Sequence, residues 1–272
     1  MEENRIENEI STYICLNQFR EPLLKKIIKL LEFPVGSTGL DAGCGIGFIT
    51  NLLAETIGPT GQVIGLDFSK DYIQYAQRKY QNIKFKEGDI KTLPFPDNTF
   101  DWIWSADTVW VGPKELGCPS DNPFTIINEY RRVVKPSGSI ILLFWSSQKL
   151  LPGYPFLEAC LNATSSGTAP FQSDMDPIFH ILNCKHWLIE SGLNDVSAKT
   201  YLYDINAPLN EEVRKALLIL FDMLWGESKL EINESDWEKY SILIDPNSEN
   251  FIINNPQYYG YYSYTVFKGK VV

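Results

Sequence analysis

A short glycine-rich segment at residues 39–48 (GLDAGCGIGF) constrains the fold of this chain more than any other feature. It follows a run typical of a buried strand and precedes an amphipathic stretch typical of a helix. Glycine recurs at Gly43, Gly45 and Gly47, and a backbone without side chains is one that a ligand can approach closely. The segment therefore predicts a strand, a ligand-binding loop and a helix in immediate succession.

The residues around this loop alternate short β-branched or aromatic runs with longer amphipathic segments, which is typical of parallel strands joined by crossover helices. We expect strands at residues 38–42, 61–67, 83–87, 100–105 and 139–145. The helices between them are expected at residues 22–31, 47–57, 70–80 and 125–134. This half of the chain is therefore predicted to be α/β.

The regular alternation stops after Trp145. Residues 146–176 are rich in Pro, Gly, Ser and Thr and are predicted to form an irregular insertion with one short helix at 156–162. Further helices are expected at residues 178–192, 211–225 and 235–243, and two further strands at residues 193–203 and 261–268. Insertions of this kind often cover a functional site.

Charge and hydropathy exclude several classes of partner. The chain has 24 Lys and Arg against 34 Asp and Glu, a net charge of −10 that repels a nucleic-acid backbone. Its longest apolar run, residues 140–145, is far shorter than the roughly 20 residues that cross a bilayer. The acidic first residues also lack the apolar core of a secretion signal. We therefore expect a cytoplasmic protein with neither nucleic-acid nor membrane partners.

Cysteine and histidine give no sign of a disulfide framework or a metal site. The five cysteines are odd in number, widely spread and contain no C-x-x-C pair, so free thiols in a reducing compartment are expected. The two histidines, His180 and His186, fall on different faces of a predicted helix. No metal is expected.

The register of the glycines separates two kinds of nucleotide-binding loop. A dinucleotide fingerprint, G-x-G-x-x-G, would need its third glycine at Phe48, so the nicotinamide interpretation fails. The spacing from Asp41 is D-x-G-x-G-x-G, which resembles motif I of the class I S-adenosylmethionine-dependent methyltransferases. Three further segments resemble later motifs of that family in the right order, namely VIGLDF at 63–68, EGDI at 87–90 and FDWIWS at 100–105.

The resemblance covers roughly residues 20–146 and is closest to the small-molecule branch that includes ubiquinone and menaquinone C-methyltransferases. It implies a Rossmann-like α/β fold, a seven-stranded mostly parallel sheet flanked by helices, with lid insertions after strand five and between strands six and seven. We expect one domain over residues 1–272. Its cofactor-binding half is residues 20–146, and residues 147–177 and 208–257 form lid or substrate insertions.

The resemblance also implies S-adenosylmethionine as cofactor and S-adenosylhomocysteine as product. In this family an acidic residue at the place of Asp67 accepts the ribose hydroxyls, and one at the place of Asp89 takes the adenine amino group. The residues expected to bind the cofactor are Tyr13, Asp41, Gly43, Cys44, Gly45, Gly47, Asp67, Phe68, Asp89, Ile90 and Ser105.

Purely structural roles, without ligand binding, remain open for some of these residues. Asp41 can instead cap the following helix. Phe68 either stacks on adenine or packs beneath a helix, and Tyr13 either folds over the cofactor or belongs to the core.

The expected reaction is an in-line displacement at the methyl group, which needs alignment more than catalytic residues. Asp107 is the nearest candidate for a base, although a solvent-facing loop aspartate is an equal interpretation. Dense aromatic residues favour a small apolar or aromatic acceptor, with Trp110 and Trp145 as candidate contacts. The Asn/Asp-Pro-Pro-Tyr/Phe sequence used to methylate exocyclic amino groups is absent at this position.

Two alternatives remain open. The first is a metalloid methyltransferase of the arsenite type, in which Cys118, Cys160 and Cys184 converge on the acceptor. The second is a non-catalytic module that senses S-adenosylmethionine or supports a partner subunit. The acceptor atom and the oligomeric state have no readable sequence signal.

Overall fold

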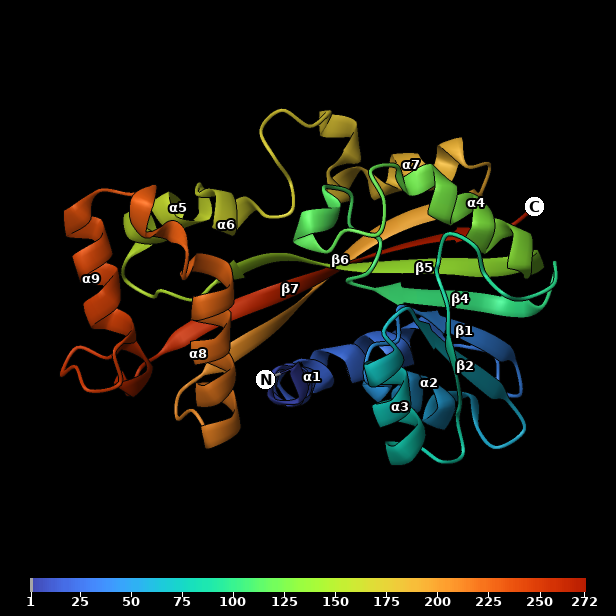
Figure 1. The fold of residues 1–272 in the computed structure, drawn as a ribbon, viewed down its shortest axis with the longest axis horizontal. Helices are drawn as coiled ribbons and strands as arrows, with labels where there is room; N and C mark the ends of the chain where they lie inside the picture. The colour runs from blue at the N-terminus through green and yellow to red at the C-terminus, as the bar shows by residue number, and fades with distance from the viewer. Residues whose placement is uncertain (1) are drawn as a thin grey trace.

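The computed structural model describes residues 2–272, which form a seven-stranded sheet with helices on both faces (Figure 1). The strands lie in the order β3-β2-β1-β4-β5-β7-β6, and only β7 runs antiparallel to its two neighbours. The strands are β1 (Thr38–Ala42), β2 (Gln62–Asp67), β3 (Lys84–Glu87), β4 (Phe100–Ala106), β5 (Val134–Lys149), β6 (Asn194–Asn206) and β7 (Tyr259–Lys270). This arrangement confirms the predicted Rossmann-like, mostly parallel α/β fold.

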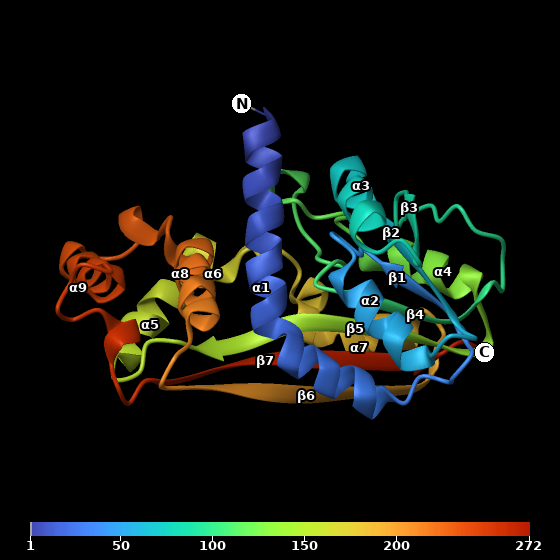
Figure 2. The same cartoon turned by 90° about the horizontal axis from the view of Figure 1, so that it is seen from below.

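The two faces of the sheet are covered by different helices. One face carries α1 (Glu2–Leu31), α2 (Phe48–Ile57) and α3 (Lys70–Lys79), and the other carries α4 (Pro123–Val133) and α7 (Cys184–Glu190) (Figures 1 and 2). Alternate residues of β4 and β5 point into separate apolar cores: Trp104 packs with α1 and α2, whereas Ile103 packs with α4 and α7. Because both faces are covered, the central strands are buried throughout.

The strands β5, β7 and β6 are much longer than the rest and extend beyond the parallel part of the sheet. Their far end carries a lobe of four helices, α5 (Pro155–Asn162), α6 (Ser165–Thr168), α8 (Glu211–Trp225) and α9 (Glu234–Ile244) (Figure 1). We call these helices the helical lobe. Short 3₁₀ turns occur at Lys114–Leu116, Pro177–Phe179, Ile181–Asn183, Ser228–Leu230 and Ile252–Asn254. The lobe and α1 share one apolar core, in which Trp225 of α8 and Leu24 of α1 are both fully buried.

Some predicted boundaries were wrong. The predicted helix at residues 22–31 is the last part of the 30-residue α1, because the buried stripe begins earlier, at Leu16 and Phe19. The predicted helix at residues 178–192 is α-helical only over Cys184–Glu190 and is preceded by 3₁₀ turns. No helix among the residues described is long and apolar enough to cross a membrane.

Candidate functional site

A cavity of about 540 Å³ lies at the carboxyl ends of β1, β2 and β4, where α1 crosses the sheet. Ligands bind at this edge of open α/β sheets because the loops that follow the strands converge there. Ten of the residues predicted to form a site line the cavity: Tyr13, Gly43, Cys44, Gly45, Asp67, Phe68, Asp89, Ile90, Asp107 and Trp110. We call this cavity the sheet-edge pocket.

The glycine loop shapes the floor of the sheet-edge pocket. Gly43 has a φ of 80°, and a Cβ atom there would collide with the side chain of Thr108 on the loop after β4. Gly45 has a φ of 51°, and a Cβ atom there would meet no heavy atom within 4 Å. Gly45 therefore keeps open the space above the loop, as a ligand-binding cradle requires. Gly47 is the N-cap residue of α2 and does not line the pocket.

Asp67 is held in place at the end of β2. Its Oδ2 accepts a hydrogen bond from the Gly45 amide at 2.8 Å, and its Oδ1 accepts one from the Ser69 amide at 2.9 Å. Burial raises the pKa of Asp67, while these amide donors act to lower it. Each oxygen still has a lone pair, so the carboxylate can accept two hydroxyl donors from the pocket side.

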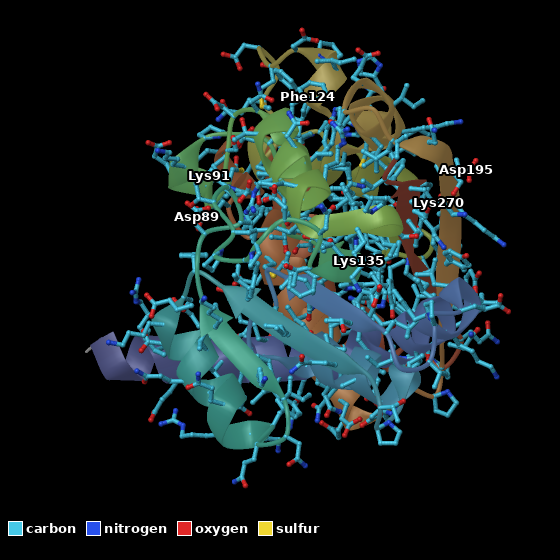
Figure 3. All side chains as sticks on the ribbon, turned by 90° about the vertical axis from the view of Figure 1, so that its right-hand side faces the viewer. Asp89, Lys91, Phe124, Lys135, Asp195 and Lys270 are labelled. Atoms are coloured by element: carbon cyan, nitrogen blue, oxygen red, sulfur yellow. The ribbon has the colours of Figure 1, made fainter. Side chains whose placement is uncertain are left out.

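Asp89, Ile90 and Phe68, which follow the ends of β3 and β2, also line the sheet-edge pocket. Asp89 accepts a hydrogen bond from the Lys91 amide at 2.8 Å, and Figure 3 shows the two side chains near each other after β3. Phe68 is 78% exposed, so of its two expected roles it does not fill the structural one, packing beneath a helix, and its ring is free to meet a planar ligand.

Asp41 and Ser105 lie behind the pocket wall rather than in it. Asp41 is buried beneath the loop, where its Oδ2 accepts a hydrogen bond from Thr50 Oγ1 at 2.7 Å. Burial raises the pKa of Asp41 to about 7, against a lowering by Thr50, and the nearby Asp67 adds to the rise. Ser105 donates to the Ala42 carbonyl at 2.8 Å inside the core. Both side chains support the loop from below.

Asp107 lines the pocket, but its carboxylate is already engaged. Oδ2 accepts hydrogen bonds from Arg20 at 3.0 Å and from the Tyr264 hydroxyl, and Oδ1 accepts one from the Trp145 amide at 2.8 Å. Three donors of the protein, one of them a guanidinium, thus hold this carboxylate toward α1, β5 and β7 rather than toward a ligand. The geometry therefore does not fit the expected role of Asp107 as a general base.

Trp145 is also placed differently from the expectation. Its ring stacks on Tyr262, with ring centroids 4.6 Å apart and an interplanar angle of 9°, and it does not line the sheet-edge pocket. Trp110, the other candidate acceptor contact, does line the pocket, together with Lys114 and Cys118 of the same loop. One part of the pocket wall is thus the segment after β4.

Sequence reasoning missed two polar residues of α1 in the pocket wall, Asn17 and Arg20. Arg20 donates to Asp107, to the Tyr264 hydroxyl at 2.9 Å and to Asn17 Oδ1 at 2.6 Å, whereas its buried Nε has no partner among the residues described. Tyr13, Asn17 and Arg20 are four and three residues apart, so they share one helix face. The sequence signal that could have identified Asn17 and Arg20 was the presence of two polar residues beside the apolar stripe of this helix.

The three cysteines of the metalloid alternative do not assemble. Cys118 is in the pocket wall, Cys184 is buried in the core beneath α4 and α7, and Cys160 is exposed on α5. Within the described part of the chain no three His, Cys, Asp or Glu residues are grouped as metal ligands would be. The expected lid segments, residues 147–177 and 208–257, contribute no residue to the wall of the sheet-edge pocket as described.

Comparison with known proteins agrees with this geometry. The model of the methyltransferase domain family matches residues 35–176, just over half of the chain. A demethylmenaquinone methyltransferase of Bacillus licheniformis is 38% identical over 128 residues, which are 46% of this chain and 52% of the relative. One from Geobacillus is 34% identical over 139 residues, 49% of this chain and 54% of the relative. The chain spans about half the length of these curated relatives.

Two solved structures share the fold across most of the chain. A Bacillus halodurans protein assigned as a methyltransferase has a TM-score of 0.53 at 14% identity, covering 90% of this chain and 97% of its own. The YcgJ protein of Bacillus subtilis has a TM-score of 0.53 at 17% identity, covering 91% and 97%. The matched family model, which spans the glycine loop and the ends of the parallel strands, identifies this chain as a member of the methyltransferase domain family.

Proposed function

We propose that this chain transfers a methyl group from S-adenosylmethionine to a small molecule. The observation that carries the proposal is the sheet-edge pocket, in which Gly45 keeps a cradle open beside the fixed carboxylate of Asp67. The likeness to demethylmenaquinone methyltransferases supports it.

The residues of the pocket fit this cofactor along its whole length. Asp67 would accept the ribose hydroxyls, and Asp89 with Ile90 and the exposed ring of Phe68 would hold adenine. Arg20, on the same face of α1 as Tyr13, also lines the pocket and has an unused N–H on Nη2. A guanidinium binds a carboxylate well, so Arg20 would hold the amino-acid end of the cofactor.

S-adenosylmethionine supplies a methyl group that its sulfonium has already activated. The chain then needs to align the acceptor, exclude water and stabilise positive charge. Alignment of two bound reactants can contribute about 7–11 kcal/mol. The aromatic rings of Tyr13, Tyr72 and Trp110, all in the pocket wall, would add a cation–π contribution of about 0.5–2 kcal/mol. Because Asp107 is ion-paired, the proposed reaction uses no carboxylate base at that position.

We propose a small apolar or aromatic acceptor, held by the segment after β4 around Trp110. A quinone-like ring would suit this wall, in line with the names of the curated relatives. Five free cysteines and the charge of −10 support our further proposals that the protein is cytoplasmic and has no nucleic-acid partner.

The test is to incubate the protein with methyl-labelled S-adenosylmethionine and a cell extract divided into small-molecule, protein and nucleic-acid fractions. We expect label in an organic-extractable metabolite, which mass spectrometry then identifies. Label in protein or nucleic acid would contradict the proposed acceptor class. Binding of the cofactor without any transfer would instead favour a non-catalytic sensor.

A further inference from the structure

The sheet-edge pocket is connected to a buried tyrosine on the antiparallel strand. Tyr264 of β7 is fully buried and does not line the pocket. Its hydroxyl accepts a hydrogen bond from Arg20 Nη1 at 2.9 Å and donates one to Asp107 Oδ2. Arg20 and Asp107 both line the pocket, one from α1 and the other from the end of β4. Tyr264 therefore contacts two pocket residues from behind.

Of the two partners of Tyr264, Asp107 is the more firmly fixed. Its backbone has a left-handed φ of 50°, and the amide of Trp145 holds its other carboxylate oxygen. Burial holds the pKa of Tyr264 well above its ordinary value, so the hydroxyl stays protonated and can donate to Asp107 while accepting from Arg20. Of the three side chains Asp107, Tyr264 and Arg20, the long side chain of Arg20 is therefore the one whose orientation depends on the other two.

Arg20 has more donors than the protein uses. A guanidinium carries five N–H donors, and hydrogen bonds to Asp107, Tyr264 and Asn17 occupy three of them. The two left are the Nε–H, which is enclosed by the protein without a partner in the described residues, and one N–H of Nη2. The Nη2 N–H is therefore the donor that a ligand can reach, and a hydrogen bond from a guanidinium to a carboxylate is strong.

We propose that Tyr264 is a positioning residue, which orients the Arg20 guanidinium so that its unused Nη2 N–H faces the carboxylate of the bound cofactor. The inference rests on the proposed function, because it takes the amino-acid end of S-adenosylmethionine as the ligand of Arg20. Without the tyrosine hydroxyl, Arg20 Nη1 has only Asp107 to bind. The guanidinium can then rotate toward Asp107. This rotation moves the free Nη2 N–H of Arg20 away from the pocket.

The test compares two ligands that differ at the amino-acid end. S-adenosylhomocysteine carries the carboxylate, and methylthioadenosine keeps the adenosine and lacks the carboxylate. Calorimetric titration of Tyr264→Phe should show affinity for S-adenosylhomocysteine weakened about tenfold, as expected for the loss of a well-aligned bond to a charged group. Affinity for methylthioadenosine should stay within about twofold of wild type, because a shift of Arg20 leaves the ribose and adenine contacts intact.

Tyr262→Phe is the matched control. Tyr262 is equally buried, lies two residues away on β7 and donates its hydroxyl to the backbone carbonyl of Phe19 rather than to Arg20 or Asp107. Loss of that hydroxyl should leave the affinity for both ligands unchanged. Equal weakening of the two ligands by Tyr264→Phe, or no weakening of S-adenosylhomocysteine, would overturn the proposal.

The proposed function has its own readout in this experiment. Wild type that binds neither ligand would refute the cofactor assignment and the inference together, whereas a Tyr264→Phe protein that binds like wild type refutes the inference alone. If Tyr264→Phe does not fold, Arg20→Lys replaces it, because lysine keeps the charge and loses the planar array of donors. That variant must show the same ligand-selective loss, or the proposal fails.

Discussion

Three aspartates at the same edge of the sheet differ in what already holds them. Asp67 is fixed by two amides and presents its remaining lone pairs to the pocket, and Asp107 is consumed by an ion pair. Asp41 is buried beneath the glycine loop with one hydroxyl donor, from Thr50. Only the first is placed to accept hydrogen bonds from a ligand, although all three have the same side chain.

The burial of Asp41 has a consequence for the pH dependence of stability. Its pKa is raised from 3.8 to about 7 in the folded protein, so between these values the folded state binds more protons than the unfolded state. The contribution of Asp41 to the free energy of unfolding is therefore highest below about pH 4 and is lost as the pH rises through 7. Asp41→Asn keeps an acceptor for Thr50 and removes the charge. Urea unfolding should show the variant gaining on wild type by about 4 kcal/mol at pH 8 relative to pH 4. An identical difference at both pH values would contradict the account.

At the scale of elements, buried strands and tight loops could be predicted because they leave local patterns in the sequence. The first five strands were predicted from apolar runs, and ten pocket residues from the glycine spacing and the motif resemblance, because these signals depend on near neighbours. The contacts of Arg20 were not, because Tyr264 lies 244 residues away and is brought close only by the insertion of β7 between β5 and β6. No pattern within α1 could reveal a partner on the last strand.

The carboxylate of Asp107 is expected to stabilise the fold. It joins α1, β4, β5 and β7 through Arg20, Trp145 and Tyr264. Loss of this carboxylate would leave the largely buried guanidinium of Arg20 without its anionic partner. We expect Asp107→Asn, which suits the positive φ, to lower the free energy of unfolding by about 2 kcal/mol, measured by urea denaturation. Unchanged stability together with abolished methyl transfer would instead restore Asp107 as a base.

At the scale of the whole molecule, the helical lobe lies at the carboxyl end of the long strand β5 (Figure 1), whereas the sheet-edge pocket adjoins the middle of that strand, where Leu143 pairs with Ala106 at the end of β4. The helix α1 connects them, since one face lines the pocket while α1 packs against α8 in a shared core. The insertions were predicted from their composition, but their position far along the strands was not, because strand length depends on tertiary pairing.

The central claim is that the sheet-edge pocket binds S-adenosylmethionine through Asp67. Calorimetric titration with S-adenosylhomocysteine tests it directly, with wild type, Asp67→Ala and, as a control, Asp71→Ala, which removes an exposed carboxylate from the first turn of α3. We predict that wild type and Asp71→Ala bind alike and that Asp67→Ala, with its fold intact, binds about 10- to 100-fold more weakly, as expected for lost hydrogen bonds to a charged acceptor. Equal affinity of all three proteins, or no binding by wild type, would contradict the claim.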